Sequence, residues 1–365
     1  MNFDLDDDQL ALRAAALELV DNLANPACVR AFSESAAHYD ESLWRSMVSQ
    51  GWLGVGLPEA EGGAGLGMVE LAILAEVVGA HAAPAPFVAT VLARRVCERA
   101  GLRNRVESLI SGDFVACVAW SKSNSSVRAE RSSANDDDWF LEGRTDPVAY
   151  ASAANLAVVV AHSLEGPGVF AVSLDATGRP AREPAMDLTR PLSWLEFART
   201  PAQWLGGRDA VEQLIDDGAL LTAAEMLGGA QTVLDMTVAY AKDRHQFGKP
   251  IGAFQAVKHR CADMLVDVEG MRSTVYWAAW MIGASDRDAS IAASTAKCWA
   301  SDASRRVMAS GLQVHGGIGF TWEHDLHFFM KRAQLDQLTF GNARVHRQRL
   351  AAQLRPRVQA GESVV

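Results

Sequence analysis

The sequence predicts an α+β protein in which a helical segment, a β segment and a second helical segment follow one another. Apolar residues recur near the 3.6-residue helical period before residue 112 and again after residue 207. Between these segments, short apolar or alternating runs are separated by turn residues, as is typical of strands. We therefore expect an N-terminal α domain over 1–112, a middle β domain over 113–206 and a C-terminal α-helical bundle over 207–365.

In the N-terminal segment, apolar positions define helices on both sides of a glycine-rich stretch. Residues 10–20 and 71–78 follow the helical period. The stretch 51–67 between them contains Pro58 and many glycines, which permit positive φ angles and close approach of the backbone. A pair of prolines at 84 and 86 is expected to end the second helix.

The middle and C-terminal segments change period at about residue 206. Five strands are expected before this point, at 114–120, 139–142, 156–161, 169–174 and 192–197. After it, a long helix carries an apolar face over 220–241, and a helix at 291–309 is rich in small residues. Gly228 and Gly229 inside the long helix each cost about 0.8–1 kcal/mol relative to Ala, which suggests a close helix contact, either between subunits or within one.

Composition excludes several functional classes. The chain has 365 residues, with 34 Lys and Arg against 44 Asp and Glu, so its net charge is −10. An acidic protein lacks the basic field that nucleic acids and anionic membrane surfaces attract. No run approaches the ~18 uncharged apolar residues of a membrane span, and the acidic start differs from a secretory signal, which predicts a cytoplasmic protein.

Cysteine usage points to a reducing compartment. The five cysteines are odd in number, lie far apart and form no C-x-x-C pair. This pattern predicts neither a disulfide framework nor a metal site.

Three motifs carry chemical information. The first is the glycine-rich stretch 51–67; the second is Arg244-His-Gln-Phe-Gly-Lys-Pro-Ile-Gly252, with Phe254 and Gln255 just beyond; the third is Gln313-Val-His-Gly-Gly-Ile-Gly-Phe320. Arg244 closes the long helix before a glycine-containing turn, which places a guanidinium beside free backbone N–H groups, as a diphosphate requires. In the third motif, two glycines allow the backbone to approach a ligand, and Gln313 can hydrogen-bond to its polar edge.

Together these motifs, in this order, make the chain similar to the acyl-CoA dehydrogenase family over nearly its whole length. The resemblance implies a helical, a β and a four-helix-bundle domain, an acyl-CoA substrate, FAD and an electron-transfer acceptor. It also implies that FAD, here that of a neighbouring subunit, is contacted by Arg244, Phe247, Phe254, Gln255, Gln313, Gly316 and Gly317. His315, within the third motif, is expected to be packed or bonded to the backbone rather than to donate a proton.

The sequence departs from the family where the catalytic base belongs. In most members the base is the Glu of a turn that here reads Leu338-Thr-Phe-Gly-Asn342, so Phe340 stands in its place. The known alternative position, 26 residues before Arg244, is Gly218, and the family's frequent Arg at the next position is Ala219. A phenyl ring takes no proton, and we therefore predict no catalytic residue in this chain.

The β segment departs as well. The family's Thr-Glu-Pro-x-Ala-Gly-Ser segment is replaced by 121–125, of which only the hydroxyl of Ser121 is retained. The Lys-x-Trp-Ile-Thr segment that walls the flavin ring corresponds to 145–149, in which Pro147 replaces the aromatic Trp and Ala149 replaces the hydroxyl-bearing Thr.

The residues that in the family serve a neighbour's FAD are thus retained, whereas those that serve the subunit's own flavin and substrate are lost. In this asymmetry the chain resembles the non-catalytic subunit of the family's heterotetrameric branch, which is associated with actinobacterial steroid side-chain degradation. We expect an α₂β₂ tetramer with a homologous dehydrogenase subunit and a steroid-CoA substrate. One alternative is a self-sufficient homotetramer that uses Asp216, Asp217 or Glu225 as a displaced base. Another is a flavin-free scaffold that binds CoA.

Overall fold

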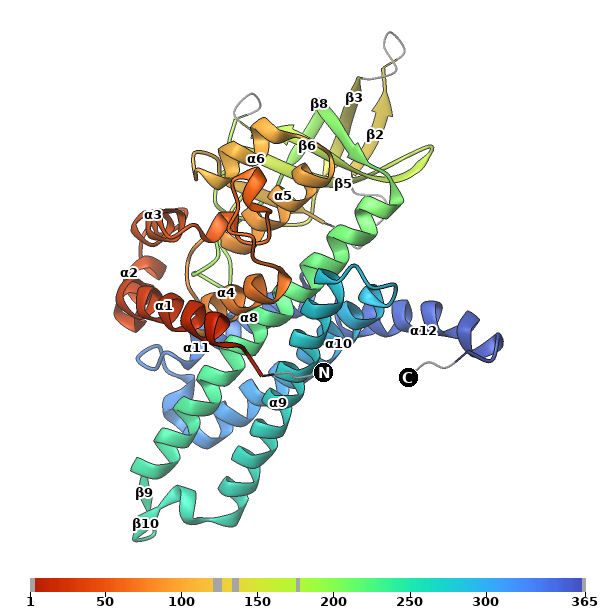
Figure 1. Cartoon of the computed structure of the whole chain (residues 1–365). Coiled ribbons are helices and arrows are strands. Elements are labelled where there is room, and N and C mark those ends of the chain that lie inside the picture. Colours follow the sequence, from red (N-terminus) through yellow and green to blue (C-terminus); the bar gives the residue numbers. More distant parts are fainter. Residues whose placement is uncertain (1–3, 121–126, 133–137, 175–177, 363–365) are drawn as a thin grey trace. The chain divides into compact units, whose positions relative to one another are not determined.

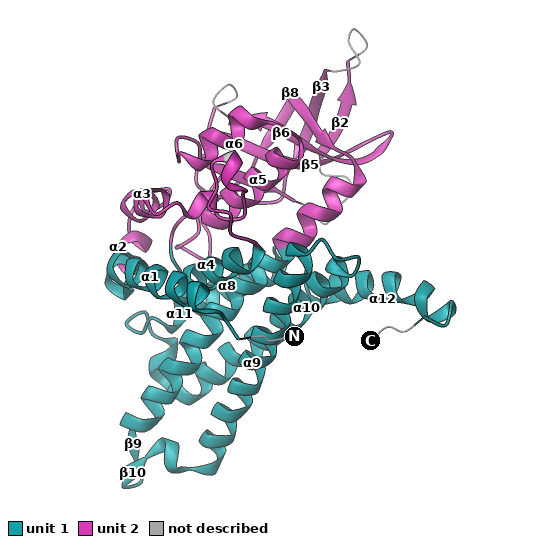
Figure 2. Ribbon diagram, viewed as in Figure 1, with its two compact units in different colours: residues 1–29, 68–83, 219–365 teal, residues 30–67, 84–218 magenta. Residues whose placement is uncertain are grey.

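We analysed a computed structural model that describes residues 4–120, 127–132, 138–174 and 178–362. Its helices and strands form two compact units, each made of separate stretches of the chain (Figures 1 and 2). Unit 1 comprises residues 1–29, 68–83 and 219–365, and unit 2 comprises 30–67 and 84–218. The domain boundaries at 112/113 and 206/207, which follow secondary-structure content, stay a prediction.

Unit 1 is helical. Asp6 begins its first helix with a capping box, because its side chain accepts from the N–H of Gln9 at 2.8 Å and Gln9 accepts from the N–H of Asp6 at 3.2 Å. Helices α9 and α10 pack side by side, and α11 and α12 both pack against α10 (Figure 1). Besides the start of α2, this unit contains α1 (Asp7–Leu23), α4 (Met68–Ala80), α8 (Arg208–Asp243) from Ala219 onward, α9 (Gln255–Gly283), α10 (Ala289–His315), α11 (Leu326–Leu338) and α12 (Ala343–Gln359).

Two glycines bring α4 and α8 into backbone contact. A Cβ atom at Gly228 would lie 1.9 Å from the carbonyl oxygen of Glu76, and one at Gly79 would lie 2.0 Å from that of Glu225. Neither position admits a side chain while the helices stay at this distance. Of the two interpretations of the glycine pair, the contact within one subunit is the one that accounts for Gly228.

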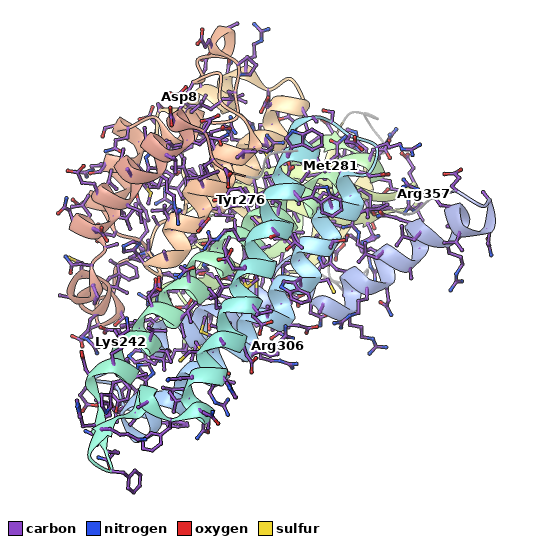
Figure 3. All side chains as sticks on the ribbon, turned by 60° about the horizontal axis from the view of Figure 1, so that its bottom comes forward. Asp8, Lys242, Tyr276, Met281, Arg306 and Arg357 are labelled. Carbon is purple, nitrogen blue, oxygen red and sulfur yellow. The ribbon has the colours of Figure 1, made fainter. Side chains whose placement is uncertain are left out.

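A buried carboxylate ties α4 to α1 and α9. Glu76, 3% exposed, accepts from Arg13 Nη2 at 3.3 Å, from Arg272 Nη1 at 2.8 Å and from the hydroxyl of Tyr276 at 2.5 Å. Burial, together with the charge of Glu76, raises the pKa of Tyr276, so its hydroxyl stays a donor. Figure 3 shows Tyr276 on the ribbon of α9. The two arginines compensate the carboxylate, as a buried charge requires.

Unit 2 combines helices with a β-sheet. Its helical elements are α2 (Pro26–Ser33, shared with unit 1), α3 (Glu41–Ser49), α5 (Phe87–Arg99), α6 (Arg103–Ile110) and the short 3₁₀ turns η1 (Trp52–Gly54) and η2 (Glu59–Glu61). The two turns lie in the glycine-rich stretch, where Gly51 adopts φ 76° and Gly62 φ 83°. Positive φ explains why glycine is needed at these two turns.

The sheet of unit 2 has the order β1-β5-β2-β3-β8-β6, and a further pairing of β5 with β6 closes it on itself. Strands β1 and β2 pair with β5 in parallel, and the remaining pairs are antiparallel. The strands are β1 (Ala116–Ala119), β2 (Val127–Arg131), β3 (Trp139–Arg144), β5 (Leu156–Ser163), β6 (Gly166–Ser173) and β8 (Glu196–Gly206), with a separate pair of β4 (Val148–Ala149) and β7 (Leu192–Ser193). The expected middle β segment is therefore present.

One strand prediction is wrong. The run 192–197 is not one strand, because β7 ends at Ser193 and the long strand β8 begins at Glu196. Strand β8 escapes pattern recognition because its burial does not alternate: Arg199 adopts φ 53°, and the register with β3 shifts between Leu141 and Gly143. Strand β2 is not among the five strands that the sequence predicts.

Among the described residues, none of the helices combines the length and apolar character needed to cross a bilayer. The five cysteines are all free thiols.

Candidate functional site

The second motif forms the hairpin between α8 and α9. Helix α8 ends at Asp243, and β9 (His245–Gln246) pairs with β10 (Lys249–Pro250) before a 3₁₀ turn, η3 (Ile251–Ala253), leads into α9. The N–H of Ile251 donates to the carbonyl of Arg244 at 2.7 Å and closes the loop. Figure 1 shows this hairpin at one end of the helices of unit 1, and Figure 3 places Lys242 near that end of α8.

Three polar side chains at this end of unit 1 have no hydrogen-bonding partner within the described part of the protein. Arg244, Gln255 and Gln313 are exposed, and within the described part of the chain their side chains form no hydrogen bond or ion pair. By contrast, half-buried Arg272 of the same unit is paired with Glu76. A guanidinium and two amides that lack protein partners are available to a ligand.

Two aromatic rings accompany them. Phe247 is 90% exposed and adopts φ 53°, an unusual conformation for a bulky residue. Its ring meets that of half-buried Phe254 edge-on at 6.1 Å, and the ammonium of Lys249 lies 4.5 Å from the centre of the Phe254 ring. An exposed phenylalanine held in a strained turn is typical of a surface that contacts another molecule.

The segment 242–260 is also basic. It contains five lysines and arginines and one carboxylate, Asp243, in a chain whose overall net charge is −10. The local charge of +4 therefore runs against that of the whole molecule. This basic segment can be found in the sequence, but the net charge of the whole chain does not reveal it.

The third motif lies at the same end of unit 1. Gln313 is in the last turn of α10, and Gly316 begins the 3₁₀ turn η4 (Gly316–Phe320) with φ 63° and ψ −139°. Only glycine adopts this backbone conformation readily, and a side chain at Gly317 would meet no atom within 4 Å. The structure thus brings the second and third motifs together and leaves space beside the glycines.

At the predicted base position, the turn 338–342 presents no carboxylate. Phe340 is buried with φ 54°, and its carbonyl accepts from His346 Nε2 at 2.9 Å. Fully buried Lys297 donates to the carbonyl of Asp336 at 2.8 Å. Burial lowers the pKa of Lys297 to about 7 and that of His346 to about 3.

Lys297 and His346 therefore hold the turn although it carries no base, and neither residue is among those predicted from the sequence. A single Lys or His on a helical pattern carries no signal of burial, so only the fold shows their role.

The alternative position offers no base either. Gly218 and Ala219 are buried within α8. The adjacent Asp217 pairs with Arg95 Nε at 2.9 Å and Arg99 Nη2 at 2.7 Å. Burial by itself would raise the pKa of Asp217, but the charges and hydrogen bonds of these arginines outweigh it and lower the pKa.

Glu225, the other carboxylate of the alternative, is buried, and its Oε1 lies 3.7 Å from Arg332 Nη1. Glu225 is therefore paired with an arginine of α11 inside unit 1. Asp216 is half-buried.

The β-segment positions add little to a flavin site. Residues 121–125, including Ser121, lie outside the described residues. In the stretch 145–149, the hydroxyl of buried Thr145 accepts from the N–H of Leu195 at 3.1 Å. Val148 and Ala149 form β4 and pair with β7. These residues serve the β structure itself.

Taken as a test of fit, the end of unit 1 suits one part of a dinucleotide. A free guanidinium, two free amides and open space at Gly317 match phosphates and polar edges. The turn at Phe340 does not match the proton-abstracting part of a dehydrogenase site. No group of three His, Cys, Asp or Glu residues in the described ranges is placed to hold a metal ion.

Comparisons with known proteins show the family to which the chain belongs. Residues 6–101 match the family model "Acyl-CoA dehydrogenase, N-terminal domain", and residues 206–355 match "Acyl-CoA dehydrogenase, C-terminal domain". The chain is 32% identical to acyl-CoA dehydrogenase IpdE2 of Mycolicibacterium smegmatis over 352 residues, which cover 96% of this chain and all of the relative.

Two solved structures share the fold closely. One, a Tcur3481-Tcur3483 steroid ACAD variant, has a TM-score of 0.90 and 30% identity; the other, the ChsE4-ChsE5 complex of Mycobacterium tuberculosis, has a TM-score of 0.90 and 29% identity. Each comparison covers 97% of this chain and 99% of the other. The protein therefore belongs to the acyl-CoA dehydrogenase family of oxidoreductases, with its helical, β and helical domains.

Proposed function

We propose that this chain is the subunit of a flavin-dependent acyl-CoA dehydrogenase heterotetramer that lacks the base and completes the FAD site of a homologous partner. The observation that carries the proposal is an asymmetry. The Arg244 end of unit 1 displays polar groups without protein partners, whereas Phe340 and Gly218 occupy the two positions of the base.

The reaction removes a proton from the α-carbon of the acyl thioester and a hydride from its β-carbon, leaving an α,β double bond. FAD, when bound, supplies the hydride acceptor. A carboxylate must take the α-proton, and neither Asp217 nor Glu225 is suited to this because each faces arginine. Because Phe340 and Gly218 occupy the two positions where the family has its base, we assign the carboxylate to the partner subunit.

The residues of this chain act on the nucleotide half of the cofactor. Arg244 makes charge-assisted hydrogen bonds to the diphosphate, and the amides of Gln255 and Gln313 bond to polar edges nearby. Gly316 and Gly317 let the backbone approach closely, while Phe247 and Phe254 supply apolar contact. These groups bind and orient FAD, and none of them moves a proton.

A steroid-CoA is the proposed substrate class, and an α₂β₂ tetramer in the cytoplasm is the proposed assembly. Support comes from the two similar structures, one described as a steroid ACAD and the other as a complex of two different chains. Five free cysteines suit a reducing compartment. An external electron-transfer acceptor is the proposed further partner and would return the bound cofactor to its oxidised form.

Reconstitution tests the proposal. The chain is purified alone and together with a dehydrogenase homologue that has the missing Glu, and both preparations are assayed with a steroid-CoA and an artificial electron acceptor. We expect turnover only from the mixed preparation. Turnover by the pure chain at a comparable rate would overturn the assignment and favour the self-sufficient enzyme.

A further inference from the structure

His315 is buried directly before the Gly316–Gly317 turn. It is 3% exposed, and its Nδ1 lies 2.8 Å from the carbonyl oxygen of Gly311. Because a carbonyl only accepts, Nδ1 carries the proton in this arrangement and Nε2 is left as an acceptor. Burial lowers the pKa of His315, which keeps the ring neutral near pH 7.

The ring of His315 stacks on another element of unit 1. Its centre lies 4.6 Å from that of Tyr240, with 25° between the ring planes. Tyr240 is one turn before Arg244 on the chain, and its carbonyl accepts from the N–H of Arg244 at 2.8 Å. The ring of His324, which follows η4, meets His315 edge-on at 4.5 Å. The last turn of α10 is thus joined to the end of α8 through aromatic rings.

From this geometry we infer that His315 is a positioning residue, which holds the Gly316–Gly317 turn in register with Arg244 so that both reach one nucleotide. The inference rests on the proposed function, in which these two segments bind a partner's FAD. His315 itself does not touch the cofactor. Its ring fixes the distance between the two segments, and its Nδ1–H fixes the last turn of α10.

Neutral charge suits this role. The groups that face the ring are the phenol of Tyr240, the imidazole of His324 and the carbonyl of Gly311. None of them is a carboxylate that would stabilise an imidazolium.

The test measures FAD affinity of the assembled complex with its partner subunit, by titration of flavin fluorescence. His315→Ala removes the ring, and His315→Phe keeps a ring of similar width. His162→Ala is the matched control, since His162 is half-buried on β5 and outside unit 1. We expect His315→Ala to weaken FAD binding roughly three- to tenfold, the range of an aromatic pair. His315→Phe should recover most of this loss, and the control should bind as the wild type does.

A double-mutant cycle separates positioning from general destabilisation. If the stack carries the effect, Tyr240→Leu weakens binding as His315→Ala does, and the double variant is no weaker than either single variant. Additive losses, or wild-type affinity of His315→Ala, would overturn the inference. Tyr240→Leu and His315→Phe keep the test open should His315→Ala fail to fold.

Arg244→Ala separates the positioning role of His315 from the proposed function. Weaker binding in Arg244→Ala with unchanged binding in His315→Ala contradicts only the positioning role. Unchanged binding in Arg244→Ala contradicts the proposed function itself.

Discussion

Alanine at Gly228 should destabilise the protein, whereas alanine at its neighbour Gly229 should not. A Cβ atom at Gly228 would lie 1.9 Å from the carbonyl oxygen of Glu76 and 2.6 Å from the nitrogen of Ala80. Ordinary contacts begin at 3.4 Å, so α4 and α8 must separate by about 1.5 Å. Overpacking of this kind costs about 1–3 kcal/mol, and the better helix propensity of Ala returns at most about 1 kcal/mol.

Gly229→Ala is the matched control. There the nearest atoms to a Cβ lie at 3.5 and 3.6 Å, which is ordinary contact, and the propensity gain of up to about 1 kcal/mol remains. Urea unfolding followed by circular dichroism measures both variants. We expect a lower midpoint for Gly228→Ala and an equal or higher one for Gly229→Ala. Equal midpoints for the two variants would show that α4 and α8 are not in backbone contact.

Three further predictions address the site. Arg244→Ala in the assembled complex should raise the FAD dissociation constant by about one to two decades, because charge-assisted hydrogen bonds contribute roughly 1.5–3 kcal/mol. The circular dichroism spectrum should not change. Lys297→Met should remove a pH dependence of the free energy of unfolding. Folding depresses the pKa of Lys297 to about 7, so wild-type stability rises with pH above 7 by up to about 1.4 kcal/mol per unit. The rise ends near pH 10, where the lysine of the unfolded chain loses its proton. Parallel stability curves of the two proteins between pH 7.5 and 9.5 would refute this. Phe340→Glu in the chain alone should produce no measurable dehydrogenation in the acceptor assay, because the flavin-ring segment is also replaced; robust turnover would contradict the account.

Sequence periodicity predicted the order of helical and β segments because each burial pattern repeats over many residues. It located the long helix over 220–241 and the strand at 156–161, which are now α8 and β5. It failed for β8, where Arg199 resets the register and breaks the alternation. Local pattern cannot anticipate a bulge that partner strands determine.

The candidate site divides in the same way. Motif spacing predicted Arg244 and Gln313 as cofactor contacts, which stays a prediction. It could not predict that the ends of α8 and α10 meet through Tyr240 and His315. Likewise, Asp217 reads as a candidate base until its partner Arg95, 122 positions away, is seen beside it. Such pairings depend on tertiary packing, which one sequence does not encode in any local pattern.

The ratio of FAD to protein chains tests the central claim most directly. The tagged chain is coexpressed with a homologue that carries the catalytic Glu, and the complex is analysed by light scattering and by flavin absorbance after denaturation. The account predicts a tetramer with equal amounts of the two chains and FAD at about half the number of chains, while the chain purified alone holds little FAD. A homotetramer of this chain with one FAD per subunit would contradict it.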